Sequence, residues 1–475
     1  MTDTDTAAGS VLPRLGTGHV RLDVADRVAT LTLDRPAKLN AVTPPTCPTS
    51  ATCRPSASPP RTPPRAAARS PRSAPPFSAS AERNVMNQWP DASTILPADG
   101  TGGALAGRVW RPGLGPSVVA VREDGLHDVT AAFPTVRDLC ESPDPAARLR
   151  AAHGERIAGL DEVLANTPVD DRDPRRPWLL APVDLQAVKA AGVTFVVSML
   201  ERVIEERVRG DAAGAAEARE SIRRLVGDDV AALRPGSEEA AALKEILVAQ
   251  GAWSQYLEVG IGPDAEIFTK APVLSAVGVG ADAGVHPASR WNNPEPEVAL
   301  AVSSTGAAVG ATLGNDVNLR DVEGRSALLL PQAKDNNASA ALGPFLRLFD
   351  ADFGIDDVRR ATVTLTVEGA DGYRLGAESS MAAISRDPLD LVAQLLGPHH
   401  QYPDGAVLYL GTMFAPVEDR DAPGQGFTHH DGDLVAIATP RLGTLVNRIR
   451  ASDACAPWTF GIADLMRSLV ARGAL

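Results

Sequence analysis

The sequence predicts an α+β protein with a large antiparallel or mixed β core. Between Ile267 and about Val446, strand-like apolar runs alternate with Gly, Asn and Pro, and one stretch, PLDLVAQLL, is helical in pattern. Residues 184–248 carry apolar residues three and four apart, with opposite charges at i, i+4, which is typical of helices. Hydrophobic residues make up 44% and charged residues 22%, which excludes collagenous, coiled-coil and wholly disordered chains.

The first 85 residues differ in composition from the rest. VRLDVADRVATLTLDRPAKLNAV alternates apolar and polar positions, as two short strands do. Residues 44–80 hold 11 of the 39 prolines and lack Asp, Glu, Leu, Ile and Val, so we expect disorder there. We interpret this segment as a seam, that is, an out-of-frame translation that joins a truncated gene to a second gene. Met86 would then be the natural start of the second protein. A genuine Pro-rich linker behind a β-hairpin is the alternative.

The part before the seam resembles the opening of the enoyl-CoA hydratase (crotonase) family at LDRPAKLNAV, Leu33 to Val42. The resemblance stops at Pro44, so no functional residue of that family is carried over. We expect four segments: a truncated fragment, a disordered segment, a small β-rich domain containing GRVWRPGLGPSVVAVREDGLHDVTA, and a catalytic domain with a helical insertion at 205–250. Their ranges are 1–43, 44–85, 86–180 and 181–475.

Charge and cysteine usage exclude several partners. The chain has 46 Lys+Arg against 59 Asp+Glu, a formal net charge of −13, so it lacks the basic footprint of a nucleic-acid binder. The four cysteines form no CxxC pair, which fits a reducing cytoplasm. The acidic N-terminus is unlike a signal peptide, and no apolar run approaches the ~18 residues of a membrane span. We expect a cytoplasmic protein without membrane or nucleic-acid partners.

Three carboxylates in the segment WNNPEPEVALAVSSTGAAVGATLGNDVNLRDVEG predict a metal site. Glu295 and Glu297 leave the same face of a strand because side chains alternate. A two-residue loop at Thr305-Gly306 would pair positions whose numbers sum to 611, which places Asp316 opposite Glu295. An all-oxygen site suits Mg²⁺, Mn²⁺ or Ca²⁺. A three-residue loop would turn Asp316 to the other face, and a solvated strand edge followed by a turn is the alternative.

Residues 291–345 resemble the fumarylacetoacetate hydrolase family, whose Glu-x-Glu pair and Asp in a G-N-D segment correspond to Glu295, Glu297 and Asp316. The resemblance extends over roughly residues 95–475. It implies those three residues as ligands of one divalent metal. It also implies a fumarylacetoacetase-like mixed β-sandwich/roll in the C-terminal domain and a homodimer.

Within the family, GNDVNLRDVEGRSALLLPQAKDNNASAALGPF resembles the branch of 2-keto-3-deoxy-arabinonate dehydratases. That likeness implies an active-site lysine at Lys334 in LPQAK and an active-site glutamate at Glu266 in AEIFTKAP. The LGTMFAP segment puts Thr412 near the substrate carboxylate. Lys270 is a candidate for the same carboxylate or for pairing with Glu266, and Arg320 for a supporting or substrate-binding role.

These expectations lead to a metal-dependent lyase that dehydrates a 2-keto-3-deoxy sugar acid. The metal would make the C3 protons of a 2-oxo acid more acidic. Lys334 and Glu266 would handle the C3 proton and the departing hydroxyl, in either assignment. The alternative is a hydrolase that cleaves a C–C bond in an acylpyruvate. The resemblance implies a His–Glu water-activating pair in acylpyruvate-cleaving members of the family, and this pair has no clear counterpart near Ser198 and Arg202.

Overall fold

A computed structural model describes residues 20–25, 28–33, 89–215, 217–220, 233–249 and 253–475. The chain divides into two compact units, Met1–Ser80 and Ala81–Leu475. In the first unit, β1 (Val20–Ala25) pairs antiparallel with β2 (Val28–Leu33), which confirms the predicted strand pair. The predicted disordered segment lies outside the described residues.

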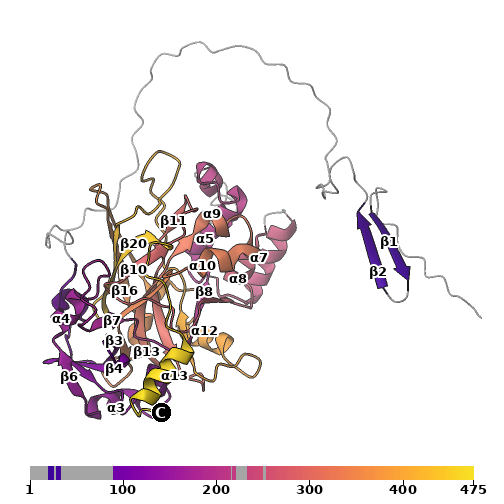
Figure 1. The fold of residues 1–475 in the computed structure, drawn as a ribbon. Coiled ribbons are helices and arrows are strands. Elements are labelled where there is room, and N and C mark those ends of the chain that lie inside the picture. Colours follow the sequence, from indigo (N-terminus) through magenta and orange to yellow (C-terminus); the bar gives the residue numbers. More distant parts are fainter. Residues whose placement is uncertain (1–19, 26–27, 34–88, 216, 221–232, 250–252) are drawn as a thin grey trace, which may run out of the picture. The chain divides into compact units, whose positions relative to one another are not determined.

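The second unit is built on a long mixed sheet (Figure 1). Its neighbours are antiparallel except that β18 pairs parallel with β8. The order is β6 (Glu155–Ala158), β5 (Gly125–Asp128), β4 (Gly115–Arg122), β3 (Leu105–Arg111), β15 (Ala340–Leu348), β13 (Ala308–Asp316), β12 (Pro296–Val302), β18 (Ala406–Tyr409), β8 (Ala187–Gly192) and β9 (Glu266–Ala271), with β7 (Trp178–Leu180) paired to β3. Strands from both predicted domains, 86–180 and 181–475, therefore join one sheet.

A second sheet packs against the first. Its order is β10 (Asp282–Val285), β20 (Gly443–Ala451), β19 (Leu434–Thr439), β16 (Thr362–Glu368) and β17 (Arg374–Ser380), and a short ladder joins β11 (Asn292–Asn293) to β14 (Asn318–Leu319). One apolar core contains residues of both sheets, including Leu300 and Leu313 of the long sheet and Leu365 and Ile437 of the second. The chain thus has the predicted α+β architecture with two packed sheets.

Helices cover the sheets and their edges. They are α1 (Ala92–Ile95), α2 (Val136–Cys140), α3 (Pro145–Ala151), α4 (Leu160–Ala165), α5 (Val196–Val208), α7 (Glu238–Ala249), α8 (Gln255–Ile261), α9 (Arg320–Glu323), α10 (Leu330–Lys334), α11 (Ile355–Arg359), α12 (Pro388–Leu395) and α13 (Ile462–Ala471). Three 3₁₀ turns lie at Ala212–Gly214, Ala327–Leu329 and Met381–Ala383. The predicted helix at PLDLVAQLL is α12, whereas the short helices α9, α10 and α11 were not predicted.

The prediction of helix across 184–248 is wrong at its start. Ala187–Gly192 forms β8, a strand between β18 and β9, because its small apolar side chains fit a buried central strand. Helix begins only with α5. Helices α5, α7 and α8 share a satellite apolar core that includes Met199, Ile204 and Leu257, and they lie on one side of the sheets in Figure 1.

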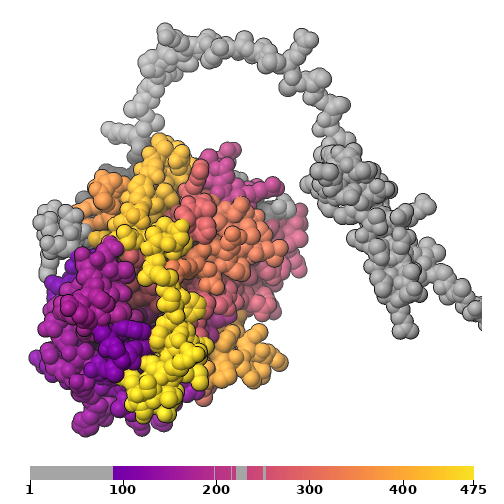
Figure 2. Space-filling view, viewed as in Figure 1, coloured from indigo at the N-terminus to yellow at the C-terminus, as the bar shows by residue number. Residues whose placement is uncertain are grey.

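The C-terminal residues return to the β-rich part of the second unit. In Figure 2 they form the yellow band across the face in view, next to the purple residues of that part. Leu465 and Leu469 of α13 are buried, and Ser468 Oγ donates a hydrogen bond to the carbonyl of Leu114 at 2.7 Å. Among the described residues, no helix is long and apolar enough to cross a membrane.

Candidate metal centre

The hairpin of β12 and β13 brings the three predicted carboxylates together. Pro296 pairs with Asn315 and Ala301 with Gly310, so the register at the site is the predicted one. The predicted two-residue loop is wrong, because Ser303 N–H bonds to the carbonyl of Ala307 and leaves three residues in the loop. A bulge next to Ala301 and Val302 accommodates one extra residue and restores the register.

The three carboxylates are buried together at the end of this hairpin. Glu295 is 0% exposed, Glu297 1% and Asp316 1%. One oxygen from each lies within 4.8 Å of the other two. The backbone fixes this end of the hairpin, since Asp316 N–H donates to the carbonyl of Glu295 at 3.1 Å and Glu295 N–H to Asn315 Oδ1 at 3.0 Å. Buried side chains on paired strands therefore present oxygens to one point.

Cationic side chains hold two of the three carboxylates. Lys334 Nζ donates to Glu295 Oε2 at 2.6 Å and to Asp316 Oδ2 at 3.0 Å. Lys270 Nζ lies 2.6 Å from Asp316 Oδ1, and Arg202 Nη2 bonds to Glu295 Oε1. Such charge-assisted bonds are short and strong in a buried site.

Glu297 differs from the other two because no cationic side chain pairs with it among the described residues. Its oxygens accept only from Gly411 N–H at 2.7 Å and from the Thr412 hydroxyl at 3.3 Å. Burial, then the charges of Asp316 and Glu295, raise the pKa of Glu297 well above its usual range. Burial also raises the pKa of Glu295, but Arg202 and Lys334 outweigh it and bring this pKa to about 2. The pocket therefore has an excess of negative charge around Glu297, which favours the protonated form of this carboxyl group.

This excess makes the residues fit a divalent cation. The site offers three carboxylate oxygens, and one of the three carboxylates, Glu297, has no cationic partner among the described residues. Mg²⁺, Mn²⁺ and Ca²⁺ prefer such hard oxygen donors. A cation would lower the pKa of Glu297 by supplying the missing positive charge. The donor chemistry therefore agrees with the predicted cofactor.

Glu266 and Glu323 form the acidic side of the same cavity. Glu266 begins β9 opposite Gly192 of β8, and a Cβ at Gly192 would lie 2.0 Å from Glu266 Oε2. Only glycine leaves room there for the carboxyl group. Burial, then the neighbouring charge of Glu323, raise the pKa of Glu266 to about 7. Glu266 is therefore partly protonated near neutral pH, as a general acid requires.

The remaining predicted residues divide into one that lines the cavity and two that do not. Thr412 lines it, beside Glu297. Lys270 is the bulge residue of β9 and lies behind Asp316, where its ammonium also donates to the carbonyl of Lys334 at 2.6 Å. The predicted ion pair between Lys270 and Glu266 is absent from the described residues, and the predicted contact with a substrate carboxylate stays a prediction. Lys270 instead positions the loop that carries Lys334.

Arg320 is also outside the cavity lining. Its Nε donates to Glu205 at 2.7 Å and its Nη2 to Glu201 at 3.0 Å, and its guanidinium lies 4.4 Å from the ring centre of Trp291. In the described part of the chain, no hydrogen bond or ion pair joins Arg320 to Asp316. It supports α5, and its predicted substrate-binding role stays a prediction.

Two cavity residues were missed as site residues in the sequence. Arg202 lies on α5, and Glu323 ends α9, directly after the GNDVNLR segment. Arg202 Nη1 lies 2.7 Å from Glu205 Oε2 and 3.1 Å from Glu323 Oε2. Glycines permit this approach of the two helix ends, since a Cβ at Gly210 would lie 2.6 Å from the carbonyl oxygen of Asp321. The i, i+3 spacing from Arg320 to Glu323 was the available signal.

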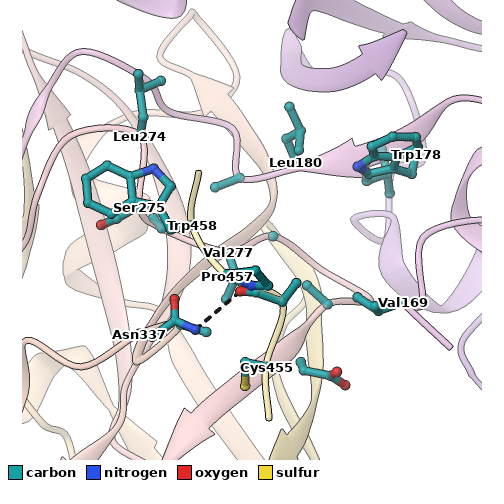
Figure 3. Close-up of a pocket in the computed structure, with 18 of the residues that line it drawn as sticks. Val169, Trp178, Leu180, Leu274, Ser275, Val277, Asn337, Cys455, Pro457 and Trp458 are labelled. Carbon is teal, nitrogen blue, oxygen red and sulfur yellow. Dashed lines mark hydrogen bonds between the residues drawn. The ribbon is translucent and has the colours of Figure 1, made fainter. Parts of the chain in front are cut away.

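The cavity itself is small and polar. Its volume of about 10 Å³ is room for about one water molecule. A separate cavity of about 170 Å³ lies between β7, β10 and the segment before α13, and mainly apolar side chains such as Trp178, Val277 and Trp458 line it (Figure 3). The small cavity differs from the larger one in its three carboxylates that lie within 4.8 Å of one another, together with Arg202 and Lys334.

Comparison with known proteins identifies a family domain that contains this site. Residues 265–450 match the family model "Fumarylacetoacetate (FAA) hydrolase C-terminal", and these residues contain Glu266, the three carboxylates, Lys334 and Thr412. The match identifies a fumarylacetoacetate hydrolase C-terminal domain in this part of the chain. The predicted family is thereby confirmed. The crotonase-like resemblance of the first 43 residues stays a prediction.

Two curated proteins are similar to this chain in sequence. The chain is 26% identical over 332 residues to a probable 2-keto-3-deoxyxylonate dehydratase of Haloferax volcanii, covering 70% of this chain and 94% of the relative. It is 32% identical over 187 residues to 2-dehydro-3-deoxy-D-arabinonate dehydratase of Saccharolobus solfataricus, covering 39% of this chain and 58% of the relative. Both relatives are named as dehydratases of 2-keto-3-deoxy sugar acids.

Solved structures establish the same fold. The apo form of 2-keto-3-deoxy-D-arabinonate dehydratase superposes with a TM-score of 0.51 at 20% identity, covering 73% of this chain and 99% of the other. The enzyme complexed with magnesium and 2,5-dioxopentanoate superposes with a TM-score of 0.50 at 19% identity and the same coverage. The fold class predicted from the sequence is confirmed.

Proposed function

We propose that the chain is a magnesium-dependent lyase that removes water from a 2-keto-3-deoxy sugar acid. The observation that carries the proposal is the pocket in which Glu295, Glu297 and Asp316 face Lys334 and a partly protonated Glu266. The names of the two curated relatives support this substrate class. The magnesium bound in the 2-keto-3-deoxy-D-arabinonate dehydratase complex supports the choice of cation.

Glu295, Glu297 and Asp316 would hold the cation. When bound, it would act as a Lewis acid on the carboxylate and keto oxygens of the substrate and make the C3 protons more acidic. One C3 proton must then pass to a base, here a water molecule beside the substrate, and the C4 hydroxyl must gain a proton to leave as water. Each proton needs a group within hydrogen-bond reach.

Glu266 is our candidate for the proton given to the C4 hydroxyl. Its carboxyl group lines the cavity and carries a proton over part of the neutral range. Lys334 is our candidate for orienting the substrate at C3, because its ammonium already donates to Glu295 and Asp316. Thr412, beside Glu297, would contact the substrate near its carboxylate.

The hydrolytic alternative has less support in the cavity. The residues of α5 that line it are Ser198 and Arg202, and the Ser198 hydroxyl donates to the carbonyl of Phe195 at 3.0 Å. No histidine stands among the described lining residues, so a His–Glu pair for water activation is missing from them. C–C bond hydrolysis would require another base.

The proposal is tested with the full-length chain, Mg²⁺ and two substrates in separate reactions, with products followed by mass spectrometry. We expect loss of one water from a 2-keto-3-deoxy-pentonate, and no loss with Glu295→Ala. Cleavage of an acylpyruvate into pyruvate and an acid would instead support the hydrolase.

A cytoplasmic location, a homodimer and the four-segment division of the chain remain proposals. Mass analysis of the native protein tests the division most directly. Abundant peptides from residues 1–80 would contradict the interpretation of this part as a translated seam.

A further inference from the structure

Arg202 lines the cavity, and the proposed reaction does not use its guanidinium. Arg202 has an 8% exposed side chain and lines the cavity from α5. Among the described lining residues, its guanidinium and the Lys334 ammonium are the cationic groups. An arginine fork is suited to planar carboxylates, which it binds through two N–H groups.

The two ends of this guanidinium have different partners. Nη1 is anchored to Glu205 Oε2 at 2.7 Å and to Glu323 Oε2 at 3.1 Å, both on the helical side of the cavity. Nη2 bonds to Glu295 Oε1 on the hairpin side. Glu295 is also one of the three carboxylates that together fit a divalent cation. Arg202 and a cation would therefore compensate the same negative charge.

We infer that Arg202 is a substrate-binding residue whose Nη2 exchanges Glu295 for the carboxylate of the bound 2-oxo acid. The inference rests on the proposed function. A cation that neutralises Glu295 makes the Arg202 bond to it dispensable, whereas Glu205 and Glu323 keep the guanidinium in place. The freed N–H group then faces the side from which an anionic substrate meets the metal-binding carboxylates.

The size of the cavity agrees with this exchange. Its volume of about 10 Å³ admits no sugar acid, so a lining group must move before substrate enters. Glu297 is bonded to the backbone at Gly411, and Asp316 and Lys334 are held by the buried Lys270. The bond from Arg202 Nη2 to Glu295 joins the two sides of the cavity, so its release would widen the cavity while Nη1 stays on the helical side.

The test uses full-length protein, Mn²⁺ as the metal probe and pyruvate as an unreactive 2-oxo acid, both measured by calorimetry. In Arg202→Gln we expect Mn²⁺ to bind about tenfold more tightly, because a competing positive charge is gone. Pyruvate should bind the Mn²⁺-loaded variant about tenfold or more weakly, because a charge-assisted hydrogen bond is lost. These opposite changes are not expected from a residue that only supports the fold.

Arg219→Gln is the matched control. Arg219 pairs with Glu201 at 2.7 Å and belongs to the same helical side, but it does not line the cavity. It should leave both affinities within twofold of wild type. Arg202→Lys serves if the Gln variant does not fold, and we expect it to retain Mn²⁺ affinity and bind pyruvate several-fold more weakly.

Weaker binding of both Mn²⁺ and pyruvate in Arg202→Gln would assign Arg202 a supporting role and overturn the inference. Unchanged pyruvate binding would overturn it as well, while wild-type dehydration of the sugar acid would leave the proposed function intact. Wild-type protein that binds no Mn²⁺ would refute both together.

Discussion

The hairpin wall and the helical wall of the cavity are built by different means. On the hairpin wall, β12 and β13 place Glu295 and Asp316 through backbone pairing between residues close in sequence. On the helical wall, Arg202, Glu205 and Arg320 are placed by ion pairs between α5 and α9, whose residues are more than a hundred positions apart in the chain. Strand pairing sets positions by geometry, whereas buried ion pairs need every partner present.

This difference predicts that the two walls fail in different ways. Loss of a carboxylate on the hairpin should abolish metal binding and leave the sheet folded. Loss of a charge on the helical wall should affect stability or proton transfer first. The following substitutions separate these outcomes, starting with the largest expected effect.

Glu295→Ala should have the largest effect on the hairpin wall. We expect kcat/KM to fall on the order of 1000-fold or more, since even indirect partners of metal ligands contribute 10- to 100-fold. Calorimetry should detect little Mn²⁺ binding. Glu378→Ala, an exposed carboxylate on β17 of the second sheet, is the control and should behave as wild type. Full metal affinity in Glu295→Ala would remove this residue from the metal site.

Arg320→Met should have the largest effect on the helical wall. It leaves Glu205 and Glu201 buried without the guanidinium that bonds to both, which costs about 3–5 kcal/mol in comparable buried networks. Urea unfolding measures the loss. Arg219→Met, whose side chain is 28% exposed, should cost about 1 kcal/mol or less. Equal losses in the two variants would contradict a buried network centred on Arg320.

Glu266→Gln should lower kcat/KM about 100-fold, because a general acid is lost. The acid form of Glu266 is the active one and its pKa is about 7. In the wild type, kcat/KM should therefore fall as the pH rises through about 7. The variant should lack this alkaline decline. An unchanged decline in Glu266→Gln would assign it to another group.

Gly192→Ala tests the same carboxyl group without altering its chemistry. The added Cβ would lie 2.0 Å from Glu266 Oε2 and must displace it. We expect kcat to fall about 10- to 100-fold, as misplaced catalytic groups do, with Mn²⁺ affinity unchanged. Wild-type kcat would mean that the position of Glu266 is unimportant.

Glu323→Gln should have the smallest effect. Burial raises the pKa of Glu266 most, and the charge of Glu323 raises it further. Without that charge the pKa of Glu266 falls, so the alkaline decline should move to lower pH by about one unit. That shift corresponds to a roughly tenfold lower rate above neutral pH. A pH profile with no shift would show that Glu323 does not act on Glu266.

The metal-binding side of the site could be predicted from the sequence because its geometry is local. The alternation of side chains in a strand puts Glu295 and Glu297 on one face, and a short loop returns the chain to Asp316. The loop length was wrong, yet the predicted register holds because a bulge near Val302 absorbs the extra residue. Neither the bulge nor the strand at Ala187–Gly192 has a clear local sequence pattern, so neither was predicted.

Only the tertiary structure decided the opposite wall and the roles of the cations. Arg202 meets Glu295 across 93 positions of the chain, and Lys270 meets the Lys334 carbonyl across 64. A charged residue has the same sequence pattern whether it is solvated or buried against a distant partner. The sequence by itself determined which oxygens gather at one point of the sheet. Long-range packing decided which charges surround them, because burial and pairing depend on neighbours that no local pattern specifies.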